Sequence, residues 1–223
     1  MNIACRYFSE CGPRRKNEDY VAIRKMAGKD RAVFVLCDGM GGHENGEIAS
    51  RLVADNISDF WLRHSETPDS QEKIIAVCEE TMGVFNAESK AEMGTTMAMV
   101  AIENDNALIA HCGDSRIYVV RDRNIIYQST DHVALTSEGW PIITRAFFTG
   151  RSNFIPDVKA MKIQSGDIIL ICSDGVYGNA KWSDLNDALI GDNVENIFDK
   201  IRTVAEKNAH DNYSAIFITI GNP

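Results

Sequence analysis

The sequence predicts an α+β fold, a layered sandwich in which mainly antiparallel β-sheets are covered by helices on the outside. Two observations lead to this expectation. Short strand-like runs are interrupted by pairs of helical stretches, which favours antiparallel sheets over a regular βαβ alternation. Successive strand-like runs are also separated by brief turn signals such as "ENDN" and "GDS", a spacing typical of an antiparallel meander.

The amino-terminal half predicts three strands and then two helices. The runs "IACRYFS", "YVAIRKM" and "RAVFVLC" predict strands over 3–9, 20–26 and 31–37, because apolar residues alternate or dominate along them. Helices are expected over 46–63 and 71–88, where apolar residues recur every three or four positions. Such apolar stripes indicate helix faces that pack on a core.

The carboxy-terminal half returns to short strands. The further strands are expected over 95–102, 107–113, 116–122, 124–130, 157–163, 166–172 and 214–220. A less regular piece covers 131–156, and two helices are expected over 181–190 and 194–208. Because no repeat, low-complexity tract or linker rich in Pro, Gly or Ser interrupts the chain, residues 1–223 are expected to form one domain.

Composition excludes several classes of protein. No apolar run approaches the roughly 18 residues that a membrane helix needs, and a formal net charge of −9 argues against binding nucleic acid through a broad basic surface. The amino terminus has no basic region followed by an apolar one, so the cytoplasm is the expected location. The six cysteines form no CxxC pair and are expected to be buried, reduced thiols.

Carboxylates stand where the apolar strands begin or end. These residues are Glu18, Asp19, Asp38, Asp114, Asp174 and Asp211. A single aspartate in such a place is commonly a turn or cap residue, but that interpretation weakens when several occur in one chain. If the strand ends converge, like charges about 4 Å apart repel by roughly 4 kcal/mol at an effective dielectric of 20. Oxygen ligands without His or Cys suit hard cations, so bound Mg²⁺ or Mn²⁺ is expected to neutralise them.

The stretch "VFVLCDGMGG" places one of these carboxylates in front of several glycines. Gly39 lets the backbone carbonyl after Asp38 approach a cation closely, while Gly41 and Gly42 permit dihedrals and contacts that a Cβ would forbid. Asp38 can therefore bridge two metal ions while the Gly39 carbonyl binds one of them.

Eight motifs then occur in the order found in a known family. They are "RRKNED", "DGMGGHENGEIAS", "GTT", "GDSRIY", "TDH", "TRAF", "SDG" and "DNYSAIFI". In this order they resemble the metal-dependent protein phosphatases of type 2C, the PPM family, and most of all its bacterial branch. The resemblance covers nearly the whole chain. It implies a four-layer αββα sandwich of two antiparallel sheets, with a binuclear Mn²⁺ or Mg²⁺ site in a cleft at one end.

The resemblance also implies a reaction and a set of ligands. The reaction is hydrolysis of phosphoserine and phosphothreonine in proteins, by attack of a hydroxide that bridges the two metals, and it opposes a Ser/Thr kinase. Carried over by motif, Asp38, Gly39, Asp174 and Asp211 bind the two metals, Glu18 and Asp19 hold metal-bound waters, and Asp114 contributes to a third, weaker metal.

Two more residues are assigned to the substrate. Arg14 matches the arginine that grips the substrate phosphate, and its planar bidentate donor suits a phosphate better than a lysine would. His43 is a candidate general acid for the leaving alkoxide. In the eukaryotic form of the motif the histidine directly follows "DG", where this chain has Met40, so His43 could instead cap the helix or contact a water.

The chain departs from the family pattern at two places. Only 12 residues separate His132 from Arg145, where many relatives carry a longer segment that forms a flap beside the cleft, so substrate selection can differ here. Gly178 occupies a place where relatives often carry an acidic residue or asparagine. This departure weakens the expectation that a third metal binds.

Three rival functions compete with this one. A cysteine phosphatase is suggested by "HCGDSR", but three residues separate Cys112 from Arg116, where the thiolate loop of that class has five. A nucleotide-binding role lacks a GxxxxGK[ST] loop. The third rival, a catalytically weak pseudophosphatase that binds or senses phosphoproteins, would keep the fold without turnover.

Overall fold

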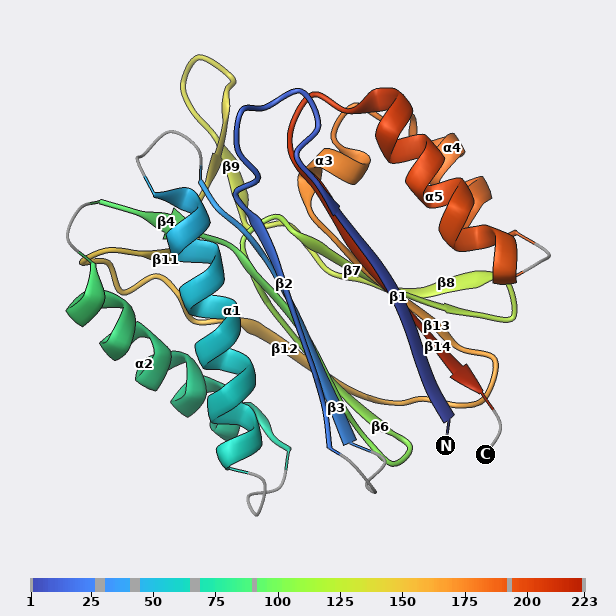
Figure 1. Ribbon diagram of the computed structural model, residues 1–223, viewed down its shortest axis with the longest axis horizontal. Coiled ribbons are helices and arrows are strands. Elements are labelled where there is room, and N and C mark those ends of the chain that lie inside the picture. The colour runs from blue at the N-terminus through green and yellow to red at the C-terminus, as the bar shows by residue number, and fades with distance from the viewer. Residues whose placement is uncertain are drawn as a thin grey trace.

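Two antiparallel β-sheets face each other, and helices cover the outer face of each (Figure 1). The computed structural model describes residues 2–26, 31–40, 45–64, 69–89, 92–191 and 194–221. Within these residues each of the two large sheets has five strands. The expected four-layer αββα sandwich is therefore confirmed.

The first sheet has the strand order β12-β6-β5-β3-β2, and every neighbouring pair is antiparallel. Its strands are β2 (Asp19–Lys25), β3 (Arg31–Asp38), β5 (Met97–Glu103), β6 (Asn106–Cys112) and β12 (Asp157–Lys162). The helices α1 (Gly46–Arg63) and α2 (Gln71–Glu88) cover its outer face (Figure 1). The side chain of Ser70 caps α2 by accepting a hydrogen bond from the backbone N–H of Lys73.

The second sheet has the strand order β1-β14-β13-β7-β8 and is also antiparallel throughout. Its strands are β1 (Asn2–Glu10), β7 (Arg116–Arg121), β8 (Asn124–Gln128), β13 (Ile168–Cys172) and β14 (Tyr213–Gly221). The helices α4 (Trp182–Leu189) and α5 (Val194–Asn208) lie over its outer face (Figure 1). A one-turn helix, α3 (Asp174–Tyr177), follows β13 directly and was not anticipated from the sequence.

The unbroken apolar run of β3 is explained by burial on both faces. Val33, Val35 and Cys37 pack in the cluster beneath α1 and α2, whereas Phe34 and Leu36 pack between the two sheets. A strand covered on both sides has no position where a polar side chain would reach water, so the alternation disappears.

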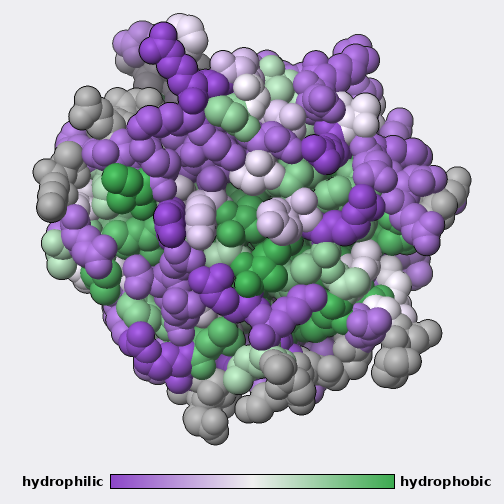
Figure 2. Space-filling model, in the orientation of Figure 1, coloured by the Kyte–Doolittle hydropathy of each residue, from purple (hydrophilic) through white to green (hydrophobic). Residues whose placement is uncertain are grey.

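Figure 2 shows apolar side chains near the middle of one face of the molecule, with hydrophilic ones over much of the rest.

The stretch expected to be irregular contains three short strands. They are β9 (Val133–Leu135), β10 (Pro141–Ile143) and β11 (Phe147–Phe148), and the last of them pairs with β4 (Gly94–Thr95). β9 and β10 form a hairpin, which projects at the end of the sandwich opposite the chain termini (Figure 1).

The expectation for the cysteines is correct for four of six. All are free thiols, and Cys37, Cys78, Cys112 and Cys172 are buried. Cys5 and Cys11 are only half-buried; Cys11 belongs to the loop after β1, and its thiol donates to the carbonyl of Arg14 at 3.1 Å. Among the helices that the structure describes, none has the length and apolar character required to cross a membrane.

Candidate metal centre

A cavity of about 660 Å³ opens where the strands of both sheets end. Its lining residues are Arg14, Glu18, Asp38, Gly39, Met40, Thr96, Asp114, Pro141, Ile142, Ile143, Asp174 and Asp211. It thus gathers the residues singled out from the sequence, apart from Asp19 and His43. Asp19 lies in the buried layer beside the cavity, and His43 falls outside the described residues.

Backbone hydrogen bonds hold Asp38 in place at the end of β3. Its N–H donates to the Thr96 hydroxyl at 3.0 Å, and its carbonyl accepts from the Thr96 N–H at 2.9 Å. The hydroxyl of Thr95 donates to the same carbonyl at 2.9 Å. These hydrogen bonds fix the backbone of Asp38 against β4 and β5, and its side chain lines the cavity.

Gly39 is required by the close approach of three backbone segments. Its N–H donates to the carbonyl of Glu18 at 3.0 Å. A Cβ at this position would lie 2.7 Å from that same carbonyl oxygen and would also collide with the carbonyl of Gly46. The position thus admits no side chain, and it brings the start of β2, the end of β3 and the start of α1 together beside the cavity.

Asp19 is a buried carboxylate with one oxygen left without a partner. It stands directly opposite Asp38 in the pairing of β2 with β3. The Ser173 hydroxyl donates to Asp19 Oδ2 at 2.8 Å, whereas Oδ1 has no hydrogen-bond partner. The pKa of Asp19 is raised to about 7, mainly by burial and also by the charges of Asp174 and Asp211, while hydrogen bonds with Ser214 and Ser173 oppose the rise.

The neighbouring carboxyls are perturbed in the same direction. Burial, then the charges of the other carboxylates, raises the pKa of Asp38 well above its usual range. Burial and the charge of Asp174 raise the pKa of Asp114 to about 6. The pKa values of Asp174 and Glu18 are also raised, mainly by burial. Such a set of carboxyls needs either protons or cations to be stable at neutral pH.

The residues fit divalent cations better than protons. The donors are carboxylate and carbonyl oxygens, the ligands that Mg²⁺ and Mn²⁺ prefer. The unpartnered Oδ1 of Asp19 lacks the contacts that a buried carboxylate normally makes. Gly39, whose missing Cβ leaves room for the carbonyls of Glu18 and Gly46, itself lines the cavity. All three observations agree with a site for hard cations.

Arg14 lies at the rim of the cavity and is paired with one of its carboxylates. Its Nη2 lies 2.6 Å from Asp211 Oδ2, and half of its side chain is exposed. An exposed pair of this kind contributes little to folding, so the guanidinium is available to another anion that enters the cavity. Its neighbour Lys16 pairs with Glu47 at 2.8 Å.

Asn212 fixes the loop that carries Arg14, and sequence reasoning missed it. Its Nδ2 donates to the carbonyls of Cys11 at 2.8 Å and Lys16 at 2.7 Å, and its Oδ1 accepts from the N–H of Glu18 at 2.8 Å. The only signal in the sequence was its place next to Asp211, in front of an apolar strand. Its bonds reach across nearly the whole chain, so no local pattern could reveal them.

Three more side chains support the turn that presents Asp114. Gly113 adopts a φ of 118°, and a Cβ there would lie 2.6 Å from the Thr96 side chain. The Gly113 N–H donates to His132 Nδ1 at 3.2 Å, and the Tyr177 hydroxyl donates to the carbonyl of Asp114 at 2.8 Å. The motif "TDH" and the unanticipated α3 therefore act on the site through this turn.

A second group of possible metal ligands is better explained as an ion-paired network. Atoms of His111, His132 and Asp157 lie within 4.8 Å of one another. Because His132 Nδ1 accepts from a backbone N–H, the neutral ring carries its proton on Nε2, which lies 3.1 Å from Asp157. Arg145 Nη1 lies 2.6 Å from the same carboxylate. The arginine thus already supplies the cation in this place.

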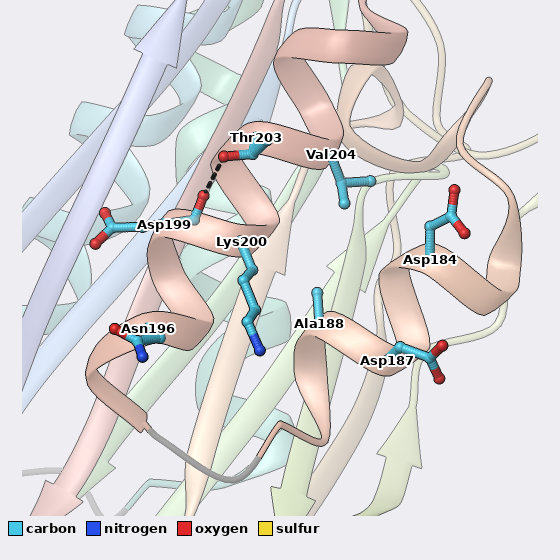
Figure 3. Close-up of a pocket in the computed structure, with 8 residues that line it drawn as sticks. All are labelled: Asp184, Asp187, Ala188, Asn196, Asp199, Lys200, Thr203 and Val204. Atoms are coloured by element: carbon cyan, nitrogen blue, oxygen red, sulfur yellow. Dashed lines mark hydrogen bonds between the residues drawn. The ribbon is translucent and has the colours of Figure 1, made fainter.

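A hollow of about 530 Å³ between α4 and α5 differs from the carboxylate cavity. Figure 3 shows that the carboxylates of Asp184, Asp187 and Asp199 point in different directions, and that Lys200 extends between the two helices. Since these side chains do not converge, the hollow has no shared centre of charge and offers no comparable cation site.

The cysteine phosphatase interpretation is excluded by the surroundings of Cys112. The thiol is buried, and burial raises its pKa to about 12, so it stays protonated at neutral pH. Arg116 forms two hydrogen bonds with the carboxylate of Asp131, at 2.9 and 2.7 Å, so its guanidinium already has an anionic partner.

Comparison with known proteins identifies the family. The sequence profile of protein phosphatase 2C matches residues 14–213. The protein phosphatase PhpP of Streptococcus pneumoniae is 29% identical over 208 residues, which cover 80% of each chain. The serine/threonine phosphatase PstP of Mycobacterium tuberculosis superposes with a TM-score of 0.80 at 25% identity, over 99% of both chains.

A further solved structure adds a metal to this comparison. The catalytic domain of PstP in complex with two manganese ions has a TM-score of 0.78 at 27% identity, again over 99% of both chains. The match over most of the chain, together with the named activities of these relatives, favours an active phosphatase over a pseudophosphatase. The chain belongs to the protein phosphatase 2C family and is a metal-dependent Ser/Thr protein phosphatase of the bacterial type.

Proposed function

We propose that the carboxylate cavity is the active site of this phosphatase. Its proposed metal ligands are Asp38, Gly39, Asp174 and Asp211 for two Mn²⁺ or Mg²⁺ ions, Glu18 and Asp19 for the surrounding waters, and Asp114 for a third, weaker ion. The observation that carries the proposal is that carboxylates from both sheets meet around one cavity with Arg14 at its rim, and that the pKa values of Asp38, Asp114 and Asp174 are raised there. The two manganese ions in the related PstP structure support it.

The described residues that line the cavity position the substrate, and none of them supplies a nucleophile. Arg14 offers a planar pair of donors to the phosphate, and it exchanges its Asp211 partner for that anion. The one hydroxyl in the lining, that of Thr96, is hydrogen-bonded to Asp38 N–H and to Ser115 Oγ at 2.8 Å. Bound divalent cations would lower the pKa of water and stabilise charge on the phosphoryl oxygens.

His43, outside the described residues, is the proposed general acid for the leaving alkoxide. An imidazole suits this task because its ordinary pKa lies close to neutral pH. With a phosphothreonine peptide, the pH–rate profile of a His43→Gln variant should then no longer show the fall at high pH that a deprotonated general acid causes, and its rate should be lower. The loss of rate should be much smaller with an aryl phosphate, whose leaving group is a weaker base and needs less protonation. Equal losses with both substrates would contradict the role.

The substrates are phosphoproteins, and we propose that the chain forms one catalytic domain over 1–223 that signals in the cytoplasm by opposing a Ser/Thr kinase. The family supports the phosphoprotein part. All six cysteines are free thiols, which agrees with a reducing compartment. The partner kinase would supply the phosphoserine and phosphothreonine groups that this site removes.

The test measures turnover and metal binding together. Purified protein is assayed on an aryl phosphate and a phosphothreonine peptide with EDTA, Mg²⁺ or Mn²⁺, beside Asp38→Ala and Asp174→Ala, while calorimetry follows metal binding. Asp187→Ala, in α4 and away from the cavity, is the matched control. We expect metal-dependent turnover that both cavity variants lose and the control keeps. Wild-type protein that binds metal and phosphopeptide without turnover would be a pseudophosphatase.

A further inference from the structure

The hairpin of β9 and β10 carries an exposed apolar surface beside the cavity. Leu135 is 72% exposed, Trp140 70% and Ile142 50%. Between residues 133 and 143 the single charged residue is Glu138. We name the side chains of 133–143 the hairpin surface. Large apolar side chains rarely gather in water without a partner to cover them, so this surface indicates a binding function.

The hairpin surface is continuous with the candidate active site. Pro141, Ile142 and Ile143, which make up β10, line the same cavity as the carboxylates. Within the described residues, β9 and β10 pair only with each other. Their outer edges are therefore available to an extended peptide, which binds unpaired strand edges in many complexes. A ligand bound in the cavity therefore lies beside the side chains of β10.

The base of the hairpin is tied to the turn that presents Asp114. The His132 N–H donates to the carbonyl of Gly113 at 2.9 Å, and the Thr144 N–H donates to the carbonyl of His132 at 2.8 Å. These bonds connect the hairpin to the metal-site turn through a single residue. The position of the apolar side chains relative to the carboxylates is thereby set in advance of binding.

The tip of the hairpin is closed by its own hydrogen bonds. The Thr136 N–H donates to the carbonyl of Trp140 at 2.8 Å, and the Trp140 N–H donates to the Thr136 hydroxyl at 3.1 Å. These bonds fix the backbone of the turn that carries the exposed Trp140. An aromatic side chain has few torsions to lose on binding, which suits an interface anchor.

Another part of the cavity lining has a different chemistry. It includes Arg14, whose sequence neighbours Arg15 and Lys16 are exposed. The cavity is therefore lined both by a guanidinium suited to the phosphate and by the apolar strand β10. The occupant that matches both is a chain that places an apolar side chain close to a phosphorylated one.

We propose that the hairpin surface selects phosphoprotein substrates by binding an apolar side chain next to the phosphorylated serine or threonine. Trp140 and Leu135 would contact that neighbour while the phosphate enters the carboxylate cavity. The proposal rests on the proposed function, since it names the substrates of the same site. It assigns to the short segment between His132 and Arg145 a preference for leucine-like or aromatic neighbours over polar ones.

The experiment compares two phosphothreonine peptides of equal length and net charge. One has leucine on both sides of the phosphothreonine, and the other has asparagine. The wild type, Trp140→Ser, Leu135→Ser and the conservative Trp140→Phe are assayed with Mn²⁺. Tyr7→Ser is the matched control, because Tyr7 is a 59% exposed aromatic residue on β1 and does not line the cavity. A thermal unfolding transition for each variant shows that it is folded.

We expect the wild type to prefer the leucine peptide in kcat/KM by about tenfold, the loss expected for one apolar contact. Trp140→Ser and Leu135→Ser should each reduce this ratio severalfold, mostly through KM, while Trp140→Phe and Tyr7→Ser keep it. Equal kcat/KM values for the two wild-type peptides, or an unchanged ratio in both serine variants, would overturn the proposal.

Wild-type hydrolysis of an aryl phosphate is measured in parallel. If the wild type does not hydrolyse the aryl phosphate, the proposed function is overturned. If it does, but shows no preference between the two peptides, only the hairpin proposal is overturned.

Sedimentation at the assay concentration tests whether a second copy of the chain occupies the hairpin surface. A wild-type dimer that becomes monomeric in Trp140→Ser would overturn the substrate role of this surface.

Discussion

The side-chain oxygen of Asn212 accepts a hydrogen bond of 2.8 Å from the backbone N–H of Glu18, a residue that precedes it by 194 positions. The amide nitrogen of the same side chain donates to two carbonyls, those of Cys11 and Lys16. One side chain thus joins the start of β14 to the loop that holds Arg14. The guanidinium and the carboxylates keep their relative positions through it.

Replacing Asn212 should therefore damage both stability and turnover. Asn212→Ala leaves two carbonyls and one N–H of the loop without partners, which should lower the free energy of unfolding by about 2 kcal/mol. We also expect kcat/KM for an aryl phosphate to fall, because Arg14 loses its fixed position. Asn212→Asp keeps the acceptor for Glu18 and should recover part of the stability only. Thermal unfolding and kinetics measure both effects. An unchanged kcat/KM would show that Asn212 does not position the residues of the site.

Arg14 should act on the phosphate and not on folding. Because half of its side chain is exposed, we expect Arg14→Ala to change the unfolding temperature little. Loss of a charge-assisted contact should lower kcat/KM by about 10- to 100-fold, and Arg14→Lys should recover only part of it. Inhibition by inorganic phosphate provides the second measurement. Phosphate that binds Arg14→Ala as tightly as the wild type would refute this role.

Most of the fold could be predicted from the sequence, because burial produces local patterns of apolar residues. β3 is apolar at consecutive positions since α1 covers one face and the second sheet covers the other. The helices α1 and α2 show the periodicity of one buried face. In contrast, α3 spans only four residues, which is too short for any periodicity to appear.

The candidate site could be predicted only in part. Asp38, Asp114 and Asp174 stand at the end of an apolar strand or within two residues of it, so their convergence at one end could be expected before the structure. The supporting bonds of Asn212 and His132 link positions far apart in the chain, and no local pattern encodes such contacts. The hairpin was expected to be irregular because its strands have only three residues each.

Gly39 should tolerate no side chain. In Gly39→Ala the new Cβ would lie 2.7 Å from the carbonyl oxygen of Glu18, so the backbone of β2 or β3 must shift. Overpacking of this kind costs about 1–3 kcal/mol, and the same shift should weaken Mn²⁺ binding. Gly83→Ala is the control, since a Cβ there meets nothing within 4 Å. Calorimetry and thermal unfolding compare the two, and equal stability of both variants would contradict the close approach of these backbone segments.

The Asp38 carboxylate should lower the stability of the metal-free protein although it serves metal binding. Its pKa is raised by burial and by the charges of its neighbours, so in metal-free protein a negative charge on its carboxylate opposes folding. Asp38→Asn removes that charge, and we expect it to raise the free energy of unfolding in EDTA by about 1–2 kcal/mol. Mn²⁺ should then stabilise the wild type and leave the variant unchanged. Thermal unfolding with and without Mn²⁺ measures both effects. A variant less stable than the wild type in EDTA would contradict the prediction that the charge of Asp38 opposes folding.

Asp19 should make the stability of the metal-free protein depend on pH. Its pKa is raised to about 7 in the folded protein by burial, from an ordinary value near 4 in the unfolded chain. Between about pH 4 and pH 7 the folded state therefore holds more protons than the unfolded state. Stability consequently falls as the pH rises through this range, which is the reverse of an aspartate held in a salt bridge.

The measurement is chemical denaturation in EDTA at pH 5, 6, 7 and 8, for the wild type and for Asp19→Asn. Asparagine carries no charge and can still accept the hydrogen bond from Ser173, so the variant should lose part of the slope and be the more stable protein at pH 8. Mn²⁺ should stabilise the wild type more at pH 8 than at pH 5, because protons compete with the cation for the same oxygens. A wild type whose stability rises between pH 5 and pH 7 in EDTA would show that the buried carboxyl is already ionised without metal.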